Sequence, residues 1–261
     1  MNELVAAAPL FLLVAVRALA LIETAPLLSS DAIPQTAKVA IAGFAAFAAF
    51  PSATLTTWTG DPYSLDYVVL LIGEALIGII IGFFMNVVYS AFSSAGQFFS
   101  LQMGFGASET YDPLAQIENP LMGQYLNIIA MLVFLSIGGF QQVFLGGFFR
   151  SLQSINAASL VSAREGFLAL LLGGLSNLFV DALIISMPIL GTLFLVSVSM
   201  GLLSKAAPQM NILSEGFPIS ITVAFALIMV TMPFLVDAFA RVVNAGFLQL
   251  ETLFAKAGAG I

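Results

Sequence analysis

Long apolar runs separated by short polar loops make up most of this chain. Six apolar blocks can be delimited, at residues 4–28, 39–50, 65–103, 121–149, 167–203 and 217–236. A mostly apolar run of about 18 residues or more is typical of a transmembrane helix. The pattern therefore predicts an all-α, polytopic membrane protein of about six long, partly kinked apolar helices arranged as hairpins.

The third and fifth blocks are too long for one simple crossing. A run of about 38 residues makes a helix of about 57 Å, whereas the hydrocarbon core of a bilayer is about 30 Å thick. Either these blocks fold back as tight hairpins, with Gly96 breaking the third and Pro188 bending the fifth, or they are long helices covered by other protein. A hairpin in the third block would also place Lys38, Arg150 and Arg164 on one face of the membrane, as the positive-inside rule prefers.

Small residues recur at helical spacing and indicate close helix packing. Gly78 and Gly82 form a G-x-x-x-G step, which Gly73 extends. The second block has a similar surface, made of Ala42, Ala45, Ala46 and Ala49. Small residues let helix backbones approach closely where lipid supplies no hydrophobic driving force. We expect these surfaces to pack inside the chain, with contacts to other subunits as the alternative.

Composition agrees with a lipid or apolar-protein environment. Hydrophobic residues make up 60% of the chain and charged residues only 8%, against about 25% charged residues in an ordinary globular protein. The chain has no cysteine and no histidine, which removes thiolate chemistry, disulfides and Cys/His metal sites. No cofactor is expected. With a net charge of −7 and scattered single basic residues, no nucleic-acid partner is expected either.

Several ionisable residues fall inside or at the edges of the apolar blocks. They are Arg17, Glu23, Glu74, Asp181 and Asp237. Such groups are costly in hydrocarbon and usually face protein or water. They could form a proton or ion relay, or they could pair and hydrogen-bond at a helix or subunit interface. The N-terminus lacks the basic region of a cleaved signal peptide, and Arg17 interrupts its apolar run, so we expect a retained first helix.

The loop between the third and fourth blocks is an unusual connection. It reads Gln-Met-Gly-Phe-Gly-Ala-Ser-Glu-Thr-Tyr-Asp-Pro over residues 102–113 and continues to Pro120. Glycines give it access to positive φ, and the aromatic residues Phe105 and Tyr111 give it bulk. A loop of this kind could form an apolar constriction in a pore, or it could be buried in the packing of its own subunit.

A second distinctive stretch joins the last two blocks at residues 204–218. It holds Pro208, Gly216 and Pro218, which together predict an exposed turn at the tip of a helical hairpin. Lys205 at the end of the incoming helix complements the helix dipole. These observations alone assign no chemistry to the turn.

The two stretches resemble a known family. The Ala-Pro-Gln-Met-Asn-Ile…Gly-Phe-Pro run at 207–218 and the Gln-Met-Gly-Phe…Tyr-Asp-Pro run at 102–113 are similar to sequences of the FliR family of flagellar and type III secretion export-gate proteins. The likeness covers essentially the whole chain. It implies one integral membrane domain, with residues 1–165 resembling a FliP-like subunit and residues 166–261 resembling a FliQ-like helical hairpin.

The resemblance also implies a function and its site residues. It implies a non-enzymatic subunit of a hetero-oligomeric gate in the bacterial inner membrane, within a flagellar or type III secretion basal body, that passes unfolded export substrates. FliP-like and FliQ-like subunits and a FlhB-like switch protein are the implied partners. The implied pore plug comprises Met103, Phe105, Gly106, Glu109, Tyr111, Asp112 and Pro113. The implied partner-contact tip comprises Pro208, Gln209, Met210, Asn211, Gly216, Phe217 and Pro218.

Two other classes of function remain alternatives. A small secondary transporter would place a substrate site at a carboxylate in mid-membrane, near Glu74 or Asp181. A membrane-embedded enzyme would have to rely on serine and carboxylate chemistry, because the chain lacks histidine and cysteine. A requirement for partner subunits would favour the gate, and solute uptake by the isolated chain would favour the transporter.

Overall fold

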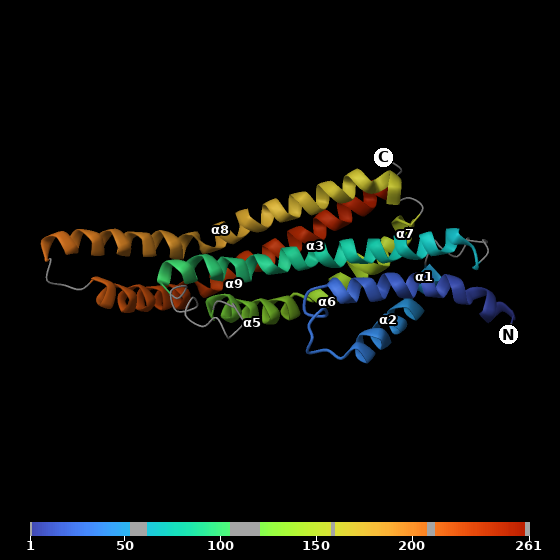
Figure 1. Ribbon diagram of the computed structural model, residues 1–261, viewed down its shortest axis with the longest axis horizontal. Coiled ribbons are helices and arrows are strands. Elements are labelled where there is room, and N and C mark those ends of the chain that lie inside the picture. Colours follow the sequence, from blue (N-terminus) through green and yellow to red (C-terminus); the bar gives the residue numbers. More distant parts are fainter. Residues whose placement is uncertain (1, 53–61, 105–120, 158–159, 208–211, 259–261) are drawn as a thin grey trace. The chain divides into compact units, whose positions relative to one another are not determined.

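The described part of the chain is helical throughout, apart from short connections. The computed structural model describes residues 2–52, 62–104, 121–157, 160–207 and 212–258, and these residues include no strand (Figure 1). The elements are α1 (Asn2–Thr24), α2 (Gln35–Ala49), the short 3-10 helix η1 (Phe50–Ser52), α3 (Leu65–Met103), α5 (Leu121–Ser136), α6 (Gly139–Gln141), the π-helix η3 (Gln142–Phe149), α7 (Arg150–Ser154), α8 (Leu160–Ala206) and α9 (Ile212–Gly258). The predicted all-α class is confirmed.

Four of the described helices are long and apolar enough to cross a membrane. They are α1, α3, α8 and α9, and a fifth crossing results if α5 and the bent segment after it are counted as one span. The second apolar block forms only the 15-residue helix α2, which is shorter than the about 20 residues that a crossing needs. The chain is therefore a polytopic helical membrane protein, as its sequence predicts.

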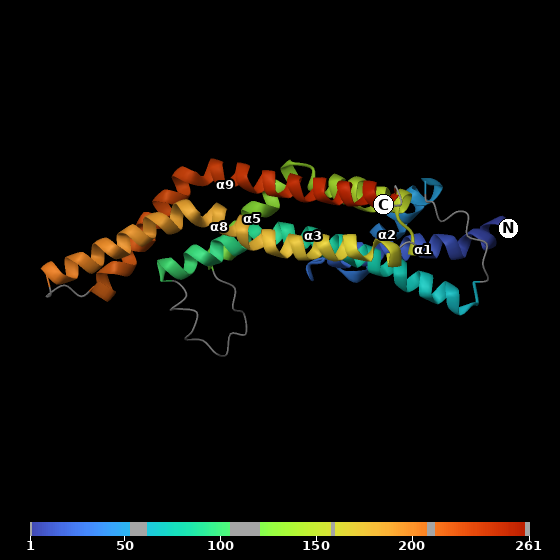
Figure 2. The same ribbon diagram turned by 90° about the horizontal axis from the view of Figure 1, so that it is seen from above.

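The third and fifth blocks are long single helices, so the hairpin alternative is wrong. α3 has 39 residues and α8 has 47, and both are unbroken ribbons in Figures 1 and 2. Gly96 does not break α3, because its bare backbone packs against α5: a Cβ at this position would lie 2.7 Å from the Met122 carbonyl oxygen. Pro188 lies within α8 without ending it. The argument that Lys38, Arg150 and Arg164 share one face of the membrane depended on a hairpin in the third block, so it no longer holds.

The fourth block bends where a single helix was expected. The axes of Met122–Ser136 and Gly139–Ser154 differ by 69°. The break falls at Gly138, whose φ of +70° is unfavourable for residues with a side chain. Beyond it the chain forms the eight-residue π-helix η3. A π-helix is rare, occurs mostly as a single-turn bulge inside an α-helix, and is frequent at functional sites.

The last helix is longer than the sixth apolar block. The block was predicted to end at residue 236, but α9 continues to Gly258. Asp237 and Arg241 lower the hydropathy at that point without interrupting the helix. Beyond it one face remains buried and apolar at helical spacing, through Phe239, Val243, Phe247, Leu250 and Phe254. Such spacing marks a helix that is amphipathic rather than apolar on all sides.

The described helices form two compact units that do not follow chain order. The first comprises residues 1–89, 135–175 and 243–261, and the second comprises residues 90–134 and 176–242. α3, α8 and α9 each contribute residues to both units. In the second unit the rings of Phe92 and Phe239 pack at a centroid distance of 4.8 Å. The division at residue 165 into FliP-like and FliQ-like parts stays a prediction.

Candidate functional site

A buried charge cluster lies at the centre of the first unit. Arg17 on α1 and Glu74 on α3 form an ion pair, and neither side chain is exposed to solvent. The Arg17 Nε donates to Oε2 of Glu74 at 2.6 Å. The remaining guanidinium nitrogens donate to Ser151 Oγ at 3.2 Å and to the Ile155 carbonyl oxygen at 2.9 Å. Every nitrogen of this buried cation therefore has a hydrogen-bond acceptor.

The second oxygen of Glu74 is engaged as well. Oε1 of Glu74 accepts a hydrogen bond from the backbone N–H of Ala157 at 2.9 Å. The neighbouring Gly73 allows this approach, because a Cβ there would lie 2.7 Å from the Ala157 Cβ. Removing a buried charge pair from water costs several kcal/mol per ion, which only good geometry and further hydrogen bonds offset. The cluster therefore fastens α1, α3 and the segment after α7 together, and it leaves Glu74 closed to a solute.

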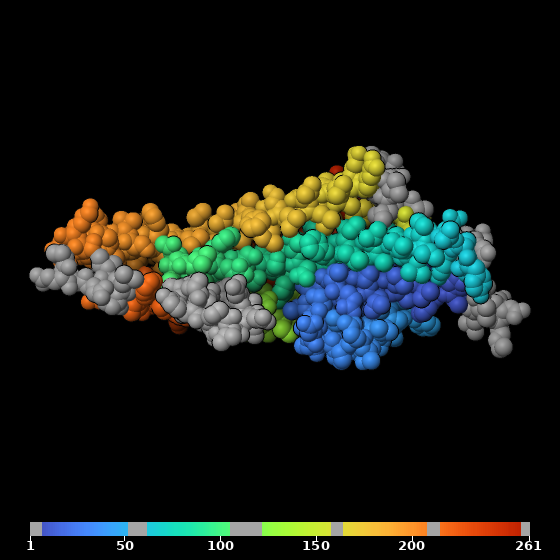
Figure 3. Space-filling model, in the orientation of Figure 1, coloured from blue at the N-terminus to red at the C-terminus, as the bar shows by residue number. Residues whose placement is uncertain are grey.

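α1 and α3 also meet through the predicted G-x-x-x-G step. A Cβ at Gly78 would clash with the Arg17 carbonyl oxygen and lie 3.0 Å from the Ala20 Cβ. A Cβ at Gly82 would clash with Thr24 Oγ1. Figure 3 shows the atoms of α1 and α2 directly against those of the first part of α3. The expectation of close packing inside the chain is confirmed for this pair of glycines.

α2 is fixed to the same group of helices by a second ion pair. The Lys38 Nζ lies 3.1 Å from Oε2 of Glu23 and donates to the Ser29 carbonyl oxygen at 3.2 Å. The predicted small-residue face of α2 is buried, at Ala42, Ala45, Ala46 and Ala49. Two of the five ionisable residues identified in apolar blocks are thus paired at Arg17–Glu74, and Glu23 has a lysine partner. These contacts favour the pairing interpretation over a relay.

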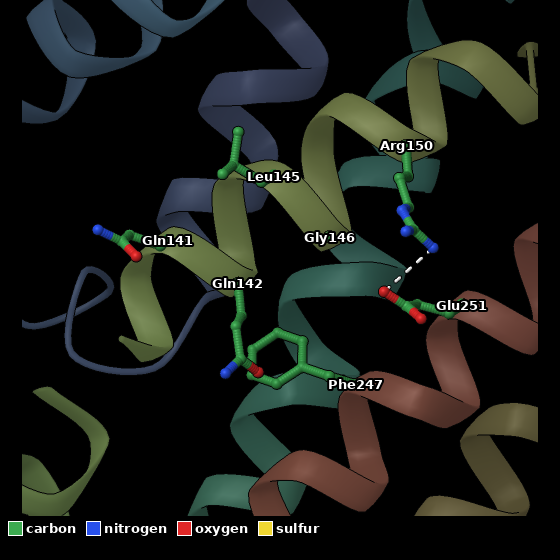
Figure 4. Close-up of a pocket in the computed structure, with 7 residues that line it drawn as sticks. All are labelled: Gln141, Gln142, Leu145, Gly146, Arg150, Phe247 and Glu251. Atoms are coloured by element: carbon green, nitrogen blue, oxygen red, sulfur yellow. Dashed lines mark ion pairs between the residues drawn. The ribbon is translucent and has the colours of Figure 1, made fainter. Parts of the chain in front are cut away.

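A groove of about 330 Å³ runs along η3 and the last part of α9. Figure 4 shows Arg150 and Glu251 facing each other at one end, with Arg150 Nη1 3.1 Å from Glu251 Oε1. The Phe247 ring lies beside the Gln142 amide in the same view. That amide nitrogen also donates to the Ile137 carbonyl oxygen at 3.2 Å, and thus holds the bend before η3. Sequence reasoning missed this groove, because only the fold brings η3 and α9 together.

The predicted plug and tip residues lie partly outside the described residues. Met103 is the last residue of α3 and is fully buried. The other predicted plug residues, Phe105, Gly106, Glu109, Tyr111, Asp112 and Pro113, lie outside the described residues, as do the tip residues Pro208, Gln209, Met210 and Asn211.

The remaining tip residues are helical rather than part of a turn. Gly216, Phe217 and Pro218 lie in the first two turns of α9, which begins at Ile212. The predicted connection over 204–218 is therefore too long at its C-terminal end. Pro218 lies in the second turn of α9 without ending the helix, although a proline beyond the first turn removes one backbone hydrogen bond.

The second unit exposes a large apolar surface. On its parts of α8 and α9, exposed side chains include Phe179, Ile184, Met187, Phe194, Met229 and Phe234. Hydroxyls on these segments mostly bond their own helix, as Thr192 does to the Pro188 carbonyl oxygen at 2.9 Å and Thr231 to the Leu227 carbonyl oxygen at 2.7 Å. Apolar surface on this scale requires lipid or another apolar protein. No group of three or more potential metal-ligating side chains occurs among the described residues.

The fold and the buried cluster around Arg17 and Glu74, here called the polar clamp, define a class of protein. It is a polytopic helical membrane protein whose charged groups pair between helices while large apolar helix faces stay exposed. Comparison with known families places the chain within that class. Residues 8–246 match the family model described as bacterial export proteins, family 1, and the chain belongs to this family. The resemblance to FliR proteins that the sequence carries is thereby confirmed.

Curated relatives cover most of the chain. The flagellar biosynthetic protein FliR of Bacillus subtilis (strain 168) is 30% identical over 259 residues, which span 97% of this chain and 96% of the relative. The protein of the same name from Escherichia coli (strain K12) is 32% identical over 83% of this chain and 82% of its own length. That of Borreliella burgdorferi is 33% identical over 72% of this chain and 70% of its own length.

Proposed function

We propose that this chain is a subunit of the flagellar protein export gate in the bacterial inner membrane, within the basal body. In this role it forms part of the channel that passes unfolded export substrates, together with FliP-like and FliQ-like subunits. A FlhB-like switch protein contacts it from the cytoplasmic side. The chain itself performs no chemical step.

The exposed apolar face of α8 and α9 carries this proposal. Each helix has 47 residues, which corresponds to about 70 Å at 1.5 Å per residue. A bilayer core of about 30 Å covers less than half of that length. Because large apolar side chains stay exposed along most of the second unit's helices, further apolar protein is needed to cover them. A hetero-oligomeric gate supplies such cover.

The relatives support the same system. Those described above are named flagellar biosynthetic proteins, and the family is one of bacterial export proteins. The flagellar system is accordingly favoured over an injectisome.

A native pull-down of the tagged chain from detergent-solubilised membranes tests the assembly. The expected result is a stable complex with FliP-like and FliQ-like subunits, identified by mass spectrometry. Deletion of the gene is expected to abolish secretion of flagellar export substrates, and the wild-type chain is expected to restore it. Recovery of a lone chain in good yield, with unchanged secretion in the deletion strain, would contradict the proposal.

The plug residues of the 103–113 stretch are the second part of the proposal. Its support is local: α3 ends in the buried Met103, and Gly104 then takes a φ of +91°, which turns the chain out of the helix. Deleting residues 106–112 is expected to make the membrane leaky to small solutes while the gate still assembles. Unchanged permeability in an assembled gate would remove the plug role.

The tip residues are the third part. Cysteines at positions 209 or 211 can carry a crosslinker without background, because the chain has no cysteine of its own. The expected product is a crosslink to the FlhB-like switch protein. Crosslinks to lipid or to the same chain alone would refute this assignment.

A further inference from the structure

The end of α3 meets the start of α9 inside the second unit. A Cβ at Gly104 would run into the Cδ1 and Cε1 atoms of the Phe217 ring, and the ring's Cγ would lie 3.4 Å away. The aromatic ring therefore occupies space that only a glycine at position 104 leaves open. With a φ of +91°, Gly104 also has a backbone conformation that residues with a side chain rarely adopt.

The surrounding contacts hold the last turn of α3 in place. Met103 is fully buried, and the Gly104 N–H donates to the Leu101 carbonyl oxygen at 3.2 Å. Gln102 Nε2 donates to Ser197 Oγ on α8 at 3.4 Å. The end of α3 thus contacts α8 at Ser197, nine residues before that helix ends, and α9 at Phe217, five residues after that helix begins.

Phe217 is partly exposed although its ring packs on Gly104. Phe217 is 41% exposed, and so is Phe225 two turns further along α9. Phe217 differs from Phe225 in having the bare backbone of Gly104 beneath its ring. A half-exposed ring on a glycine is a contact that can form and separate without opening the core of the unit.

We propose that Phe217 is a positioning residue, whose ring on Gly104 fixes the point at which the chain leaves α3 relative to the start of α9. This rests on the proposed function, since the segment that leaves at Gly104 contains the proposed plug and the connection before α9 contains the proposed switch-protein contact. A displacement of the α9 start is passed to the start of the plug segment through the contact of the Phe217 ring with Gly104.

The contact itself is tested by photo-crosslinking in native membranes. The photoreactive residue p-benzoylphenylalanine replaces Phe217 in one variant and Phe225 in the control. The expected product from position 217 is an intramolecular crosslink to the peptide that contains residues 101–104. If position 217 yields this product no more often than position 225, the contact does not exist and the proposal is overturned.

The positioning role is tested by dye entry into cells whose gate is assembled in normal amount. Phe217→Ala is expected to admit a small membrane-impermeant dye several-fold faster than Phe225→Ala, and Phe217→Leu, which keeps part of the bulk, is expected to lie between them. Gly104→Ala is expected to leak as well, because it adds a clash to a strained φ. In the double variant Gly104→Ala with Phe217→Ala, the new Cβ no longer meets the ring. The increase in dye entry should therefore be smaller than the product of the increases in the two single variants.

The outcomes separate this inference from the proposed function. If Phe217→Ala leaks no more than Phe225→Ala at equal gate assembly, the positioning role is refuted while the gate assignment stands. If the wild-type chain recovers no export partners, the gate assignment fails, yet the crosslinking result still decides whether the contact exists. The proposal is supported if position 217 forms the crosslink, Phe217→Ala leaks more than Phe225→Ala, and the double variant leaks less than the product of the single effects.

Discussion

The two units of this molecule satisfy their polar groups in different ways. In the first unit, polar side chains reach far across the sequence: Arg17 bonds Glu74, Ser151 and the Ile155 carbonyl oxygen. In the second unit most hydroxyls bond a carbonyl three or four residues earlier in the same helix, as Thr192 and Thr231 do. Helices in the first unit are therefore joined by directional contacts, whereas those of the second are joined mainly by apolar packing.

The difference teaches how sharply each unit fixes the arrangement of its own helices. A buried, fully hydrogen-bonded ion pair specifies one arrangement of α1 and α3, because any other leaves a charge without a partner. Apolar faces such as those around Met229 and Phe234 stay exposed. Because apolar contacts are not directional, these faces do not select one helix arrangement as a buried ion pair does. The first unit has exposed apolar side chains too, such as Phe44 at 75% and Leu172 at 66%. We infer that the first unit holds its helices together by a buried polar cluster, and that the second unit, which has no such cluster among the described residues, completes its packing in the assembled gate.

The largest expected effect is that of Glu74→Ala. This change leaves the buried Arg17 guanidinium without its counter-charge, and breaking one partner of a buried pair typically costs about 3–5 kcal/mol. The yield of folded chain in detergent and its unfolding temperature should both fall sharply. The matched control is Glu251→Ala, because its ion pair with Arg150 has side-chain exposures of 39% and 55%, and exposed pairs contribute little to stability.

A double replacement sharpens this result. Arg17→Met together with Glu74→Leu removes both charges, so it should recover part of the stability that Glu74→Ala loses. Recovery should be incomplete, because the Ala157 N–H loses its acceptor in both variants. Equal unfolding temperatures for Glu74→Ala and Glu251→Ala would show that the buried cluster does not hold α1 and α3 together.

The next effect concerns assembly instead of stability. Met229→Asn and Phe234→Ser alter side chains that are 78% and 73% exposed, and exposed substitutions usually change stability by no more than about 0.5 kcal/mol. The unfolding temperature of the isolated chain should therefore hardly change, while the amount of gate complex in a native pull-down should fall several-fold. An undiminished complex would mean that these faces meet lipid, not protein.

A smaller effect is expected from glycine replacements in the two units. Gly82→Ala places a Cβ 2.7 Å from the Leu21 carbonyl oxygen, and overpacking of this kind costs about 1–3 kcal/mol. Gly191→Ala on α8 places its Cβ where nothing lies within 4 Å, so the isolated chain should gain up to about 1 kcal/mol from helix propensity. Thermal unfolding in detergent measures both. A similar loss of stability in Gly82→Ala and Gly191→Ala would show that the close packing at Gly82 does not contribute more to stability than the open surroundings of Gly191.

The smallest effect separates two buried serines. Ser151→Ala removes an acceptor of Arg17, so it should destabilise the chain by about 1–2 kcal/mol. The buried Ser100 hydroxyl on α3 has no hydrogen-bond partner among the described residues, so Ser100→Ala should be neutral or slightly stabilising. Unfolding temperatures of the two variants, measured side by side, check the prediction.

Much of the fold could be predicted from the apolar pattern, and the errors have physical causes. Hydropathy alone placed the end of the sixth block at 236, because Asp237 and Arg241 follow. The helical spacing of buried residues from Phe239 to Phe254 is the signal that extends α9. Gly96 looked like a break because a glycine weakens a helix, yet its close packing on α5 offsets that weakness.

The site was less accessible to sequence reasoning. Arg17 and Glu74 each stand out as a charge in an apolar run, but they are 57 residues apart in the sequence. The spacing of apolar residues shows which face of a helix is buried, but not which other helix packs against that face. The same holds for the groove between η3 and α9, and for the contact between Gly104 and Phe217. Such contacts depend on how the long helices pack, which local residue patterns do not encode.

Photo-crosslinking from the apolar faces in native membranes tests the central claim most directly. The photoreactive residue is placed at Phe179, Phe194 or Phe234, which are exposed, and at Phe84, which is fully buried. We expect the exposed positions to yield crosslinks to other gate subunits and position 84 to yield crosslinks within the chain only. Crosslinks solely to lipid from all three exposed positions would contradict the claim that the second unit completes its packing against partner proteins.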